Sequence, residues 1–260
     1  MFTLSFAKVF YAKVEPYELR DISSNVSGEV IFIDEDMIGK KLTQKPYVRI
    51  DSQLDRVELD YIEDKLEYLR EMVKSNEAVL VNMEDSLKRK RANYQKIASL
   101  KTKSIIEKDR EFYDLINSEN LLLNTQKEIQ NLKVQITDLK LRKAYLVRSI
   151  NDKNFEAQGF VLYAILVKTG QVVGISTPIA KIADTSKAKL TIYLDEEDVR
   201  GAKEKTVFID AKETPYKISR ILNIADTKNI SKYMAQIIID APEVFSQVLK
   251  VELKEESDAN

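Results

Sequence analysis

The sequence predicts an α+β protein in which a long antiparallel helical hairpin interrupts one small β-domain and a second antiparallel β-domain follows. Three observations support this fold class. All six glycines and all five prolines lie before Tyr47 or after Gln158. The stretch between them repeats apolar residues about every 3.5 positions, as coiled coils do, whereas the flanking segments alternate apolar and polar residues.

Composition excludes several classes of function. The chain has 260 residues, of which 41 are basic and 42 acidic, so no overall field attracts nucleic acid. It contains no histidine and no cysteine, which removes the usual zinc ligands, thiol nucleophiles and disulfides. We therefore expect no catalytic residues, no metal site and no cofactor, and hence no enzyme. No segment approaches the roughly 20 apolar residues that cross a bilayer.

Residues 1–16 are predicted as an N-terminal arm. A short apolar run leads to Ser5, Phe6 and Ala7, whose small residues resemble the end of an export signal, although no basic segment precedes them. The same region also fits a first β-strand over residues 7–14. Both interpretations stand, and both are satisfied if the chain is cleaved after Ala7.

Two short β-patterned segments, residues 17–53 and 155–186, flank the helical region. They include "YELRDISS", "GEVIFID" and "YVRID" before it, and "GFVLYAILV" and "TPIAKIA" after it. Each segment is too short to bury a core alone. An antiparallel hairpin returns its ends to about 10 Å from each other, so we expect the two segments to form one domain.

The hairpin is predicted over residues 54–154, with its tip near 98–106. Two rows of residues at spacings of three and four define it. The first is Leu59, Ile62, Leu66, Leu69, Val73, Asn76, Leu80, Met83, Leu87, Lys90, Tyr94 and Ile97. The second is Leu115, Ser118, Leu122, Thr125, Ile129, Leu132, Ile136, Leu139, Lys143, Leu146 and Ile150. Matching the rows outward from a turn near residues 104 and 105 pairs Leu80 with Ile129 and Leu59 with Ile150.

Charge supports this antiparallel pairing and marks the tip. Residues 51–71 carry eight acidic and three basic side chains, while the facing residues 138–153 carry two acidic and five basic ones. Residues 88–110 carry nine basic and two acidic side chains. This excess of positive charge has two interpretations: it steers the tip toward an acidic partner, or it is only the solvated surface of the helices. Ser104 and Glu107 have the spacing of a capping box for the second helix.

Residues 187–254 are predicted as a small antiparallel β-barrel-like domain, followed by a polar tail, 255–260. Its strands include "KLTIYL", "TVFIDA", "YKISRILNI", "MAQIIIDA" and "VLKVEL". The acidic cluster at residues 195–198 lacks the alternating ligand pattern of a calcium loop, so no metal is expected there.

The order of these parts resembles a known family. Gly28 and Gly39, and likewise Gly159 and Gly170, flank similar strands eleven residues apart, a pattern similar to the half-motifs of the lipoyl or biotinyl domain. Split by a helical hairpin and followed by "IADTSKAKLTIYLDEEDVRG", the chain from about Val9 to Leu253 resembles the HlyD-type membrane fusion proteins. The resemblance implies a split lipoyl-like domain, an inserted coiled-coil hairpin and a β-barrel.

The resemblance also implies a function. Similar proteins are periplasmic adaptors, associated with the inner membrane of a Gram-negative-type envelope, that link a transporter of the RND or ABC class to a TolC-type outer-membrane channel for efflux or secretion. They self-associate as rings, often hexameric, and bind no nucleic acid. Their fourth, membrane-proximal domain is expected to be absent or reduced in this chain.

The tip of such adaptors usually shows arginine, leucine four residues later and serine seven residues beyond. Here Ile97 and Ser104 keep the second spacing, whereas Asn93 occupies the arginine position and Arg91 lies on another face. The expected channel-docking residues are therefore Arg91, Asn93, Ile97, Leu100, Lys101, Lys103 and Ser104.

Two other functions remain open from the sequence. A cytoplasmic coiled-coil scaffold would have no export signal. A lipoyl or biotinyl carrier would need a modified lysine on the tight turn that joins the two halves, where this chain inserts about 100 residues instead.

Overall fold

The computed structural model describes residues 8–225 and 232–255. The chain divides into two compact units, a helical one of residues 52–153 and a β-rich one that combines 1–51 with 154–260. The α+β class is therefore confirmed. The export signal considered at Ser5–Ala7 and residues 256–260 of the predicted tail lie outside the described residues. Within the described ranges, no helix has the length and apolarity needed to cross a membrane.

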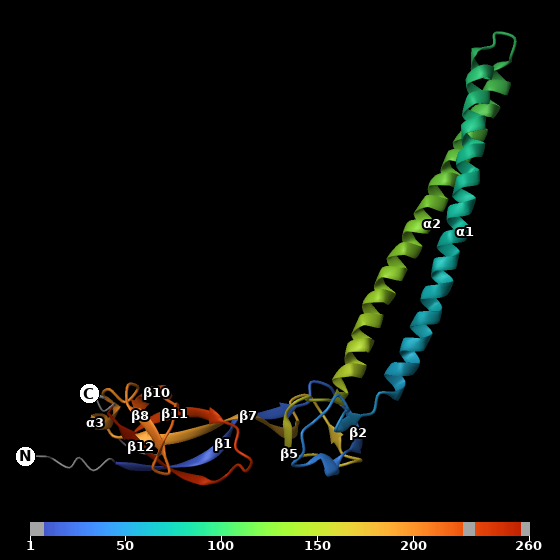
Figure 1. The fold of residues 1–260 in the computed structure, drawn as a ribbon. Coiled ribbons are helices and arrows are strands. Elements are labelled where there is room, and N and C mark those ends of the chain that lie inside the picture. The colour runs from blue at the N-terminus through green and yellow to red at the C-terminus, as the bar shows by residue number, and fades with distance from the viewer. Residues whose placement is uncertain (1–7, 226–231, 256–260) are drawn as a thin grey trace, which may run out of the picture. The chain divides into compact units, whose positions relative to one another are not determined.

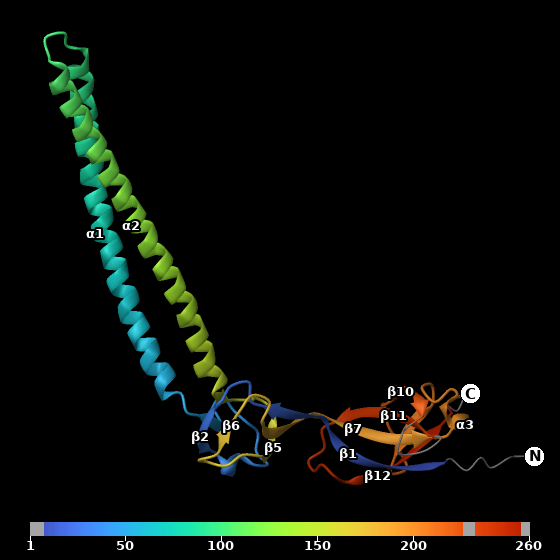
Figure 2. The same cartoon turned by 180° about the vertical axis from the view of Figure 1, so that it is seen from behind.

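The helical unit is an antiparallel hairpin of α1 (Gln53–Ser99) and α2 (Ile105–Asp152), joined by residues 100–104. Figures 1 and 2 show the two helices side by side along their length. Every residue of the two predicted rows is buried or half-buried, and Leu69, Val73, Ile129 and Leu132 form one of the seam's core clusters. At about 1.5 Å per residue, each helix is roughly 70 Å long.

Ion pairs between the helices hold the predicted register. Arg142 donates to both carboxylate oxygens of Glu58, at 2.7 and 2.9 Å, and Lys143 pairs with Glu63 at 2.7 Å. Near the hairpin's open end, Lys153 Nζ lies 2.9 Å from Asp55. The predicted attraction between the acidic start of the first helix and the basic end of the second is confirmed. Most of these side chains are exposed, so each pair contributes only a few tenths of a kcal/mol.

The first β-core is built from both flanking segments. From before the hairpin come β1 (Val9–Ser23), β2 (Gly28–Ile33), a 3-10 turn (Glu35–Met37) and β3 (Val48–Ile50). From after it come β4 (Asn154–Phe155), β5 (Val161–Ile165), β6 (Val172–Val173) and the start of β7 (Pro178–Leu194). The pairs β2–β6, β3–β4 and β1–β7 all join one segment to the other. One shared core contains Val30, Val48, Leu162 and Ile179, which confirms the split domain.

The glycine repeat marks a near-symmetry within this core. The N–H of Gly39 donates to the carbonyl of Leu162 (2.8 Å), and the N–H of Gly170 donates to the carbonyl of Val30 (2.8 Å). Both glycines have positive φ, 80° and 85°, which side chains with a Cβ rarely adopt. Each half therefore turns at its glycine and bonds a strand of the other half, β5 or β2.

The second β-core contains the described part of residues 187–254 and one strand from the N-terminus. Its strands are β8 (Thr206–Ile209), β9 (Lys212–Glu213), β10 (Ile218–Ala225), β11 (Tyr233–Asp240) and β12 (Val248–Lys254), with the short helix α3 (Glu196–Val199). Val9–Lys13 of β1 pairs with β12, and Phe10, Ala12 and Val14 point into this core. The arm predicted at 1–16 thus contributes a strand to the barrel-like domain.

Two long strands serve both cores. β1 and β7 are each continuous where the sequence suggests two strands with a boundary between them. Their ladder is irregular between Pro16 and Glu18, which pair with Ala188 and Asp184. Proline donates no backbone hydrogen bond, so it is tolerated at such an irregularity. The two cores of the β-rich unit are therefore connected by the two-stranded ladder of β1 and β7 rather than by a flexible linker.

Candidate functional site: the hairpin tip

The tip is the end of the hairpin, residues 88–119, and a capping box closes the five-residue connection between α1 and α2 at its centre. Leu100 ends α1 in an extended conformation, with its N–H donating to the carbonyl of Ile97 at 3.2 Å. Ser104 is the N-cap of α2: its hydroxyl accepts from the N–H of Glu107 (3.2 Å), and its own N–H donates to the Glu107 carboxylate (3.0 Å). The predicted capping box is confirmed. It orders the chain reversal at the end of the hairpin.

Glu107 is the electrostatic centre of this turn. The N–H of Ser104 and the ammonium of Lys103, which lies 3.1 Å away, stabilise its carboxylate and lower the pKa of Glu107 below its usual value. Lys103, one of the expected docking residues, is thus partly engaged within the turn. Ser104 is engaged as well, since its N–H and hydroxyl both contact Glu107.

Arg91 and Asn93, expected at the docking surface, bond across the hairpin. Arg91 donates through Nε and Nη2 to Oε1 of Glu119, at 2.9 and 2.7 Å. Asn93 donates to Glu111 at 3.2 Å. These contacts hold the ends of the two helices together. Their partners depend on the helix register, so sequence spacing alone does not reveal them.

Five cations near the tip make no ion pair or side-chain hydrogen bond within the described part of the chain: Lys88, Arg89, Lys96, Lys101 and Arg110. The helix register also brings Glu111, Asp114 and Glu119 beside the basic stretch. Residues 88–119, which form the spatial end of the hairpin, carry nine basic and five acidic side chains, a net charge of +4. This net positive charge is smaller than residues 88–110 alone indicate, but the end of the hairpin is still positively charged.

The tip also exposes large apolar side chains: Leu100, which sequence analysis expected at the docking surface, and Ile105 and Ile106, which it did not single out. Ile105 and Ile106, the first two residues of α2, are 77% and 81% exposed, and Leu100 is 45% exposed. Ile97, by contrast, is half-buried at the end of the core row. The sequence contains a signal for this exposure, because Ile105 and Ile106 fall outside the heptad positions of the second row. Apolar residues at such positions of a two-helix hairpin face solvent.

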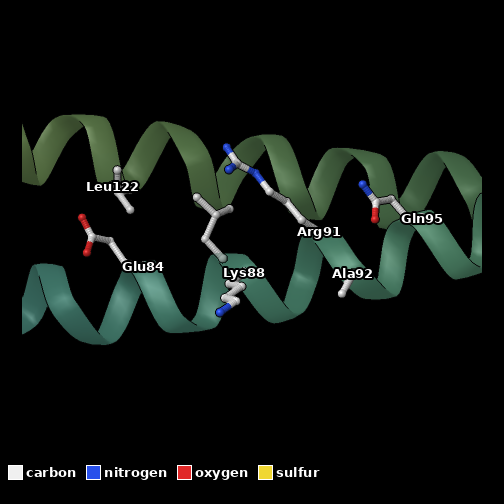
Figure 3. Close-up of a pocket in the computed structure, with 7 residues that line it drawn as sticks. Glu84, Lys88, Arg91, Ala92, Gln95 and Leu122 are labelled. Carbon is white, nitrogen blue, oxygen red and sulfur yellow. The ribbon is translucent and has the colours of Figure 1, made fainter.

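A shallow groove runs beside the tip along one side of the hairpin. Its lining residues are Glu84, Leu87, Lys88, Arg91, Ala92, Gln95 and Leu122. Figure 3 shows Leu122 of α2 on the opposite wall from Glu84 and Lys88 of α1, with Arg91 reaching toward α2. Leu87 and Leu122 belong to the two core rows, so the groove exposes part of the seam between the helices.

The acidic cluster at residues 195–198 has a structural partner. Asp195 and Asp198 both pair with Lys8, and Asp195 also lies 3.4 Å from Lys232. The ammonium of Lys8 lowers the pKa of Asp195 below its usual range. These contacts tie the N-terminal strand to α3. Among the described residues, no group of three potential metal ligands is found.

No protein-family model matches the sequence, and no curated protein sequence matches it significantly. Solved structures do match over almost the whole chain. A protein described as an efflux transporter from Bacteroides eggerthii is 14% identical with a TM-score of 0.60, covering 98% of this chain and 70% of that one. A membrane fusion protein from Streptococcus pneumoniae is 11% identical with a TM-score of 0.58, covering 96% and 100%. MacA from Actinobacillus actinomycetemcomitans is 20% identical with a TM-score of 0.54, covering 95% and 78%. Similarity at these identities establishes the fold.

Proposed function

Because the chain has the membrane fusion protein fold, we propose that it is a periplasmic adaptor that bridges an inner-membrane transporter and a TolC-type outer-membrane channel. Its role is structural rather than catalytic. The observation that carries the proposal is the tip, where exposed isoleucines, and cations with no ion pair among the described residues, lie at the end of a roughly 70 Å hairpin.

The chemistry of the tip suits an acidic partner with an apolar recess. The net charge of +4 over residues 88–119 steers the tip toward negative charge at long range. At contact, the side chains of Leu100, Ile105 and Ile106 can leave water and act as anchors. Lys101 has no partner within the described residues, so its charge is available to a partner. Arg91, Asn93 and Ser104 position these groups through contacts inside the hairpin.

The remaining partners follow from the same proposal. The barrel-like domain would face a transporter of the RND or ABC class, and several copies would assemble as a ring, as adaptors of this fold often do in sixes. The proposal places the chain in the periplasm of a Gram-negative-type envelope, next to the inner membrane. The carrier alternative is disfavoured, because β3 and β4, the strands that a carrier joins by a tight turn, are here separated by the whole hairpin.

Crosslinking in the native envelope tests tip docking. A photoreactive residue at Lys101 should crosslink the chain to an outer-membrane channel. Ile97→Asp and Ser104→Arg should abolish this product. Because Ser104 also caps α2, Ile106→Asp is the sharper variant: it places a charge on an 81% exposed side chain and leaves the cap intact.

Ile175→Asp is the matched control, since Ile175 is 72% exposed and belongs to the β-rich unit rather than to the hairpin. Unaltered crosslinking of the Ile106→Asp variant would contradict docking through the tip. Fractionation of the host addresses the scaffold alternative, since a cytoplasmic chain would contradict the adaptor. An intact mass that includes a lipoyl or biotinyl group would support the carrier instead.

A further inference from the structure

The two broad sides of the hairpin differ in charge. Cross-helix ion pairs identify the sides: Glu58 and Arg142 lie together on one, and Glu77 and Lys133 lie together on the other. Residues at steps of seven from these pairs share their side, because both helices keep a seven-residue repeat. Exposed residues three positions after those on the side of Glu58 and Arg142, such as Ser75 and Asn131, extend that side, and residues three positions before Glu77 and Glu84 extend the other. Met72 and Val79 therefore lie on the side of Glu58, and Leu121, Glu128 and Gln135 lie on the side of Arg142, which is the same side.

We use the name low-charge side for the side of the hairpin that carries Glu58 and Arg142, and only for the part of it that lies between Met72 and Ser86 of α1. On α1 it consists of Met72, Ser75, Val79, Asn82 and Ser86, all exposed. On α2 it consists of Leu121, Asn124, Glu128, Asn131 and Gln135, also exposed. Glu128 is its single charged residue. The opposite side at the same levels, the charged side, carries Lys74, Glu77, Glu84 and Lys133.

The low-charge side exposes apolar groups as well. Met72, Val79 and Leu121 are 49%, 44% and 56% exposed, and Tyr68 continues the row toward the open end of the hairpin. In a chain with 32% charged residues, such a surface is typical of one that is covered by a partner. Amide side chains on the same surface both donate and accept hydrogen bonds, so they can pair with copies of themselves.

We infer that two copies of this chain pair through their low-charge sides, in an antiparallel arrangement about a two-fold axis near Ser75 and Asn131. A two-fold contact brings the same surface of both copies together. Contact between the low-charge side of one copy and the charged side of another would instead bury the Glu77–Lys133 ion pair, which costs desolvation energy.

Charge along the hairpin favours the antiparallel direction. The tip, residues 88–119, has a net charge of +4, whereas residues 51–71 and 138–153 at the open end together carry ten acidic and eight basic side chains. A parallel pair would bring two basic tips together, and an antiparallel pair brings each tip beside an acidic open end. With the axis near Ser75, Met72 faces Val79 of the other copy, Tyr61 faces Arg89, and Glu128 faces Gln135 rather than itself.

The contact is large enough for a stable dimer. It spans α1 from Tyr61 to Arg89, about 40 Å, and two helices in width, about 20 Å, which gives about 800 Å² per partner, the size of a standard interface. The low-charge sides form its centre, and the charged Lys65, Arg89, Asp138 and Arg142 lie toward its ends, as polar residues do at the rim of an interface. The pair is separate from the ring proposed above, in which rotational symmetry places unlike sides against each other and contacts with the membrane partners offset the cost of burying the Glu77–Lys133 ion pair. It is the state expected of the chain without its membrane partners.

Two valines provide a matched test of the pairing. Val79 lies on the low-charge side and Val81 on the charged side, and they are 44% and 60% exposed on the same helix. In sedimentation of the full chain over a range of concentrations, Val79→Glu should weaken dimerisation by about tenfold or more, because a carboxylate is buried without a partner. Val81→Glu should leave dimerisation unchanged.

The absence of native cysteine allows a second, geometric test. Ser75→Cys should form a disulfide-linked dimer on mild oxidation, because the two-fold axis brings residue 75 of both copies together. Lys74→Cys, next to it on the charged side, should not. A monomer at every concentration, equal weakening by Val79→Glu and Val81→Glu, or no disulfide at residue 75 would each overturn the antiparallel pair.

Discussion

Ser104 has a structural role in the tip that does not depend on any partner. Its hydroxyl and N–H both contact Glu107, and they fix the first turn of α2. Ile105 and Ile106 follow directly, so the cap determines where these exposed side chains are held. The recognisable Ser104 to Glu107 spacing made the cap predictable, since a capping box depends only on local sequence.

Ser104→Ala should lower the stability of the hairpin by about 1 kcal/mol, because the N–H of Glu107 loses its acceptor. Urea unfolding followed by helical circular dichroism measures the change. Gln130→Ala is the control: Gln130 is exposed in the middle of α2, where alanine is the better helix former, so its loss should cost nothing. Equal effects of the two variants would show that the cap contributes no stability.

Asp55 gives the hairpin a pH dependence. Burial alone would raise the pKa of Asp55, but hydrogen bonds from Lys153 and Ser149 outweigh burial and lower this pKa below its usual value. A carboxylate with a lowered folded-state pKa contributes stability above its unfolded pKa, about 3.9, and loses it as the pH falls through the folded-state value. This contribution should therefore be complete at neutral pH.

Asp55→Asn should be less stable than the parent chain at pH 7, and the difference should shrink below about pH 4. Thermal unfolding across this pH range measures it. Asp60→Asn is the control, since Asp60 is exposed and makes no ion pair within the described residues. A constant difference between Asp55→Asn and the parent down to pH 2 would contradict the role of the carboxylate.

The contacts of Arg91 and Asn93 mark the limit of prediction at single residues. Their types and positions suggested surface groups for a partner, whereas the structure shows each bonded to α2. A cross-helix bond depends on the exact register and on side-chain direction, and heptad spacing specifies these only to within a turn. Lys101, on the connection itself, makes no such bond to any of the described residues.

At the scale of elements, α1 and α2 were predictable almost to their ends because their signals are repeated. Twelve positions of the first row, from Leu59 to Ile97, are all buried or half-buried, including the polar Asn76 and Lys90. Lys90 reaches Asp114 and Ser118, each at 2.8 Å, so its charge is satisfied within the seam. A periodic signal this long leaves few alternatives.

Strands β1 and β7 were predicted as four strands rather than two. A strand that crosses from one core to another keeps its extended backbone, so no turn residue marks the crossing. Pro16 does not end β1, because it is accommodated at an irregularity of the ladder. β1 and β7 belong to both cores because they pair with segments that are far away in the sequence. Local sequence patterns carry no information about such pairings.

Gly28 is required where two strands approach closely. A Cβ at this position would lie 2.5 Å from the side chain of Ile50, and its φ of 156° disfavours other residues. Gly28→Ala should therefore lower the melting temperature of the β-rich unit, at a cost of about 1–3 kcal/mol. Gly174→Ala, where no atom lies within 4 Å of the added Cβ, should cost much less, and similar losses for both would contradict this packing argument.

At the scale of the whole molecule, the hairpin is an insertion that the β-rich unit does not need for its own core. Val48 and Arg49 of β3 pair directly with Phe155 and Asn154 of β4, and all the residues of the first core come from outside residues 52–153. The chain that enters the hairpin and the chain that leaves it are therefore neighbours in one antiparallel ladder. Such neighbours can be joined by a two-residue turn.

Replacing residues 51–152 with Asn-Gly should yield a folded β protein, because the turn joins Ile50 to Lys153 where the ladder already brings the strands together. We expect strand-type circular dichroism, cooperative thermal unfolding and dispersed amide resonances. The same shortened chain with Val30→Asp is the negative control, since Val30 is fully buried and its carboxylate would have to be desolvated. An unfolded shortened chain would show that the hairpin holds the two β segments together, whereas a folded one would establish that they form a domain by themselves.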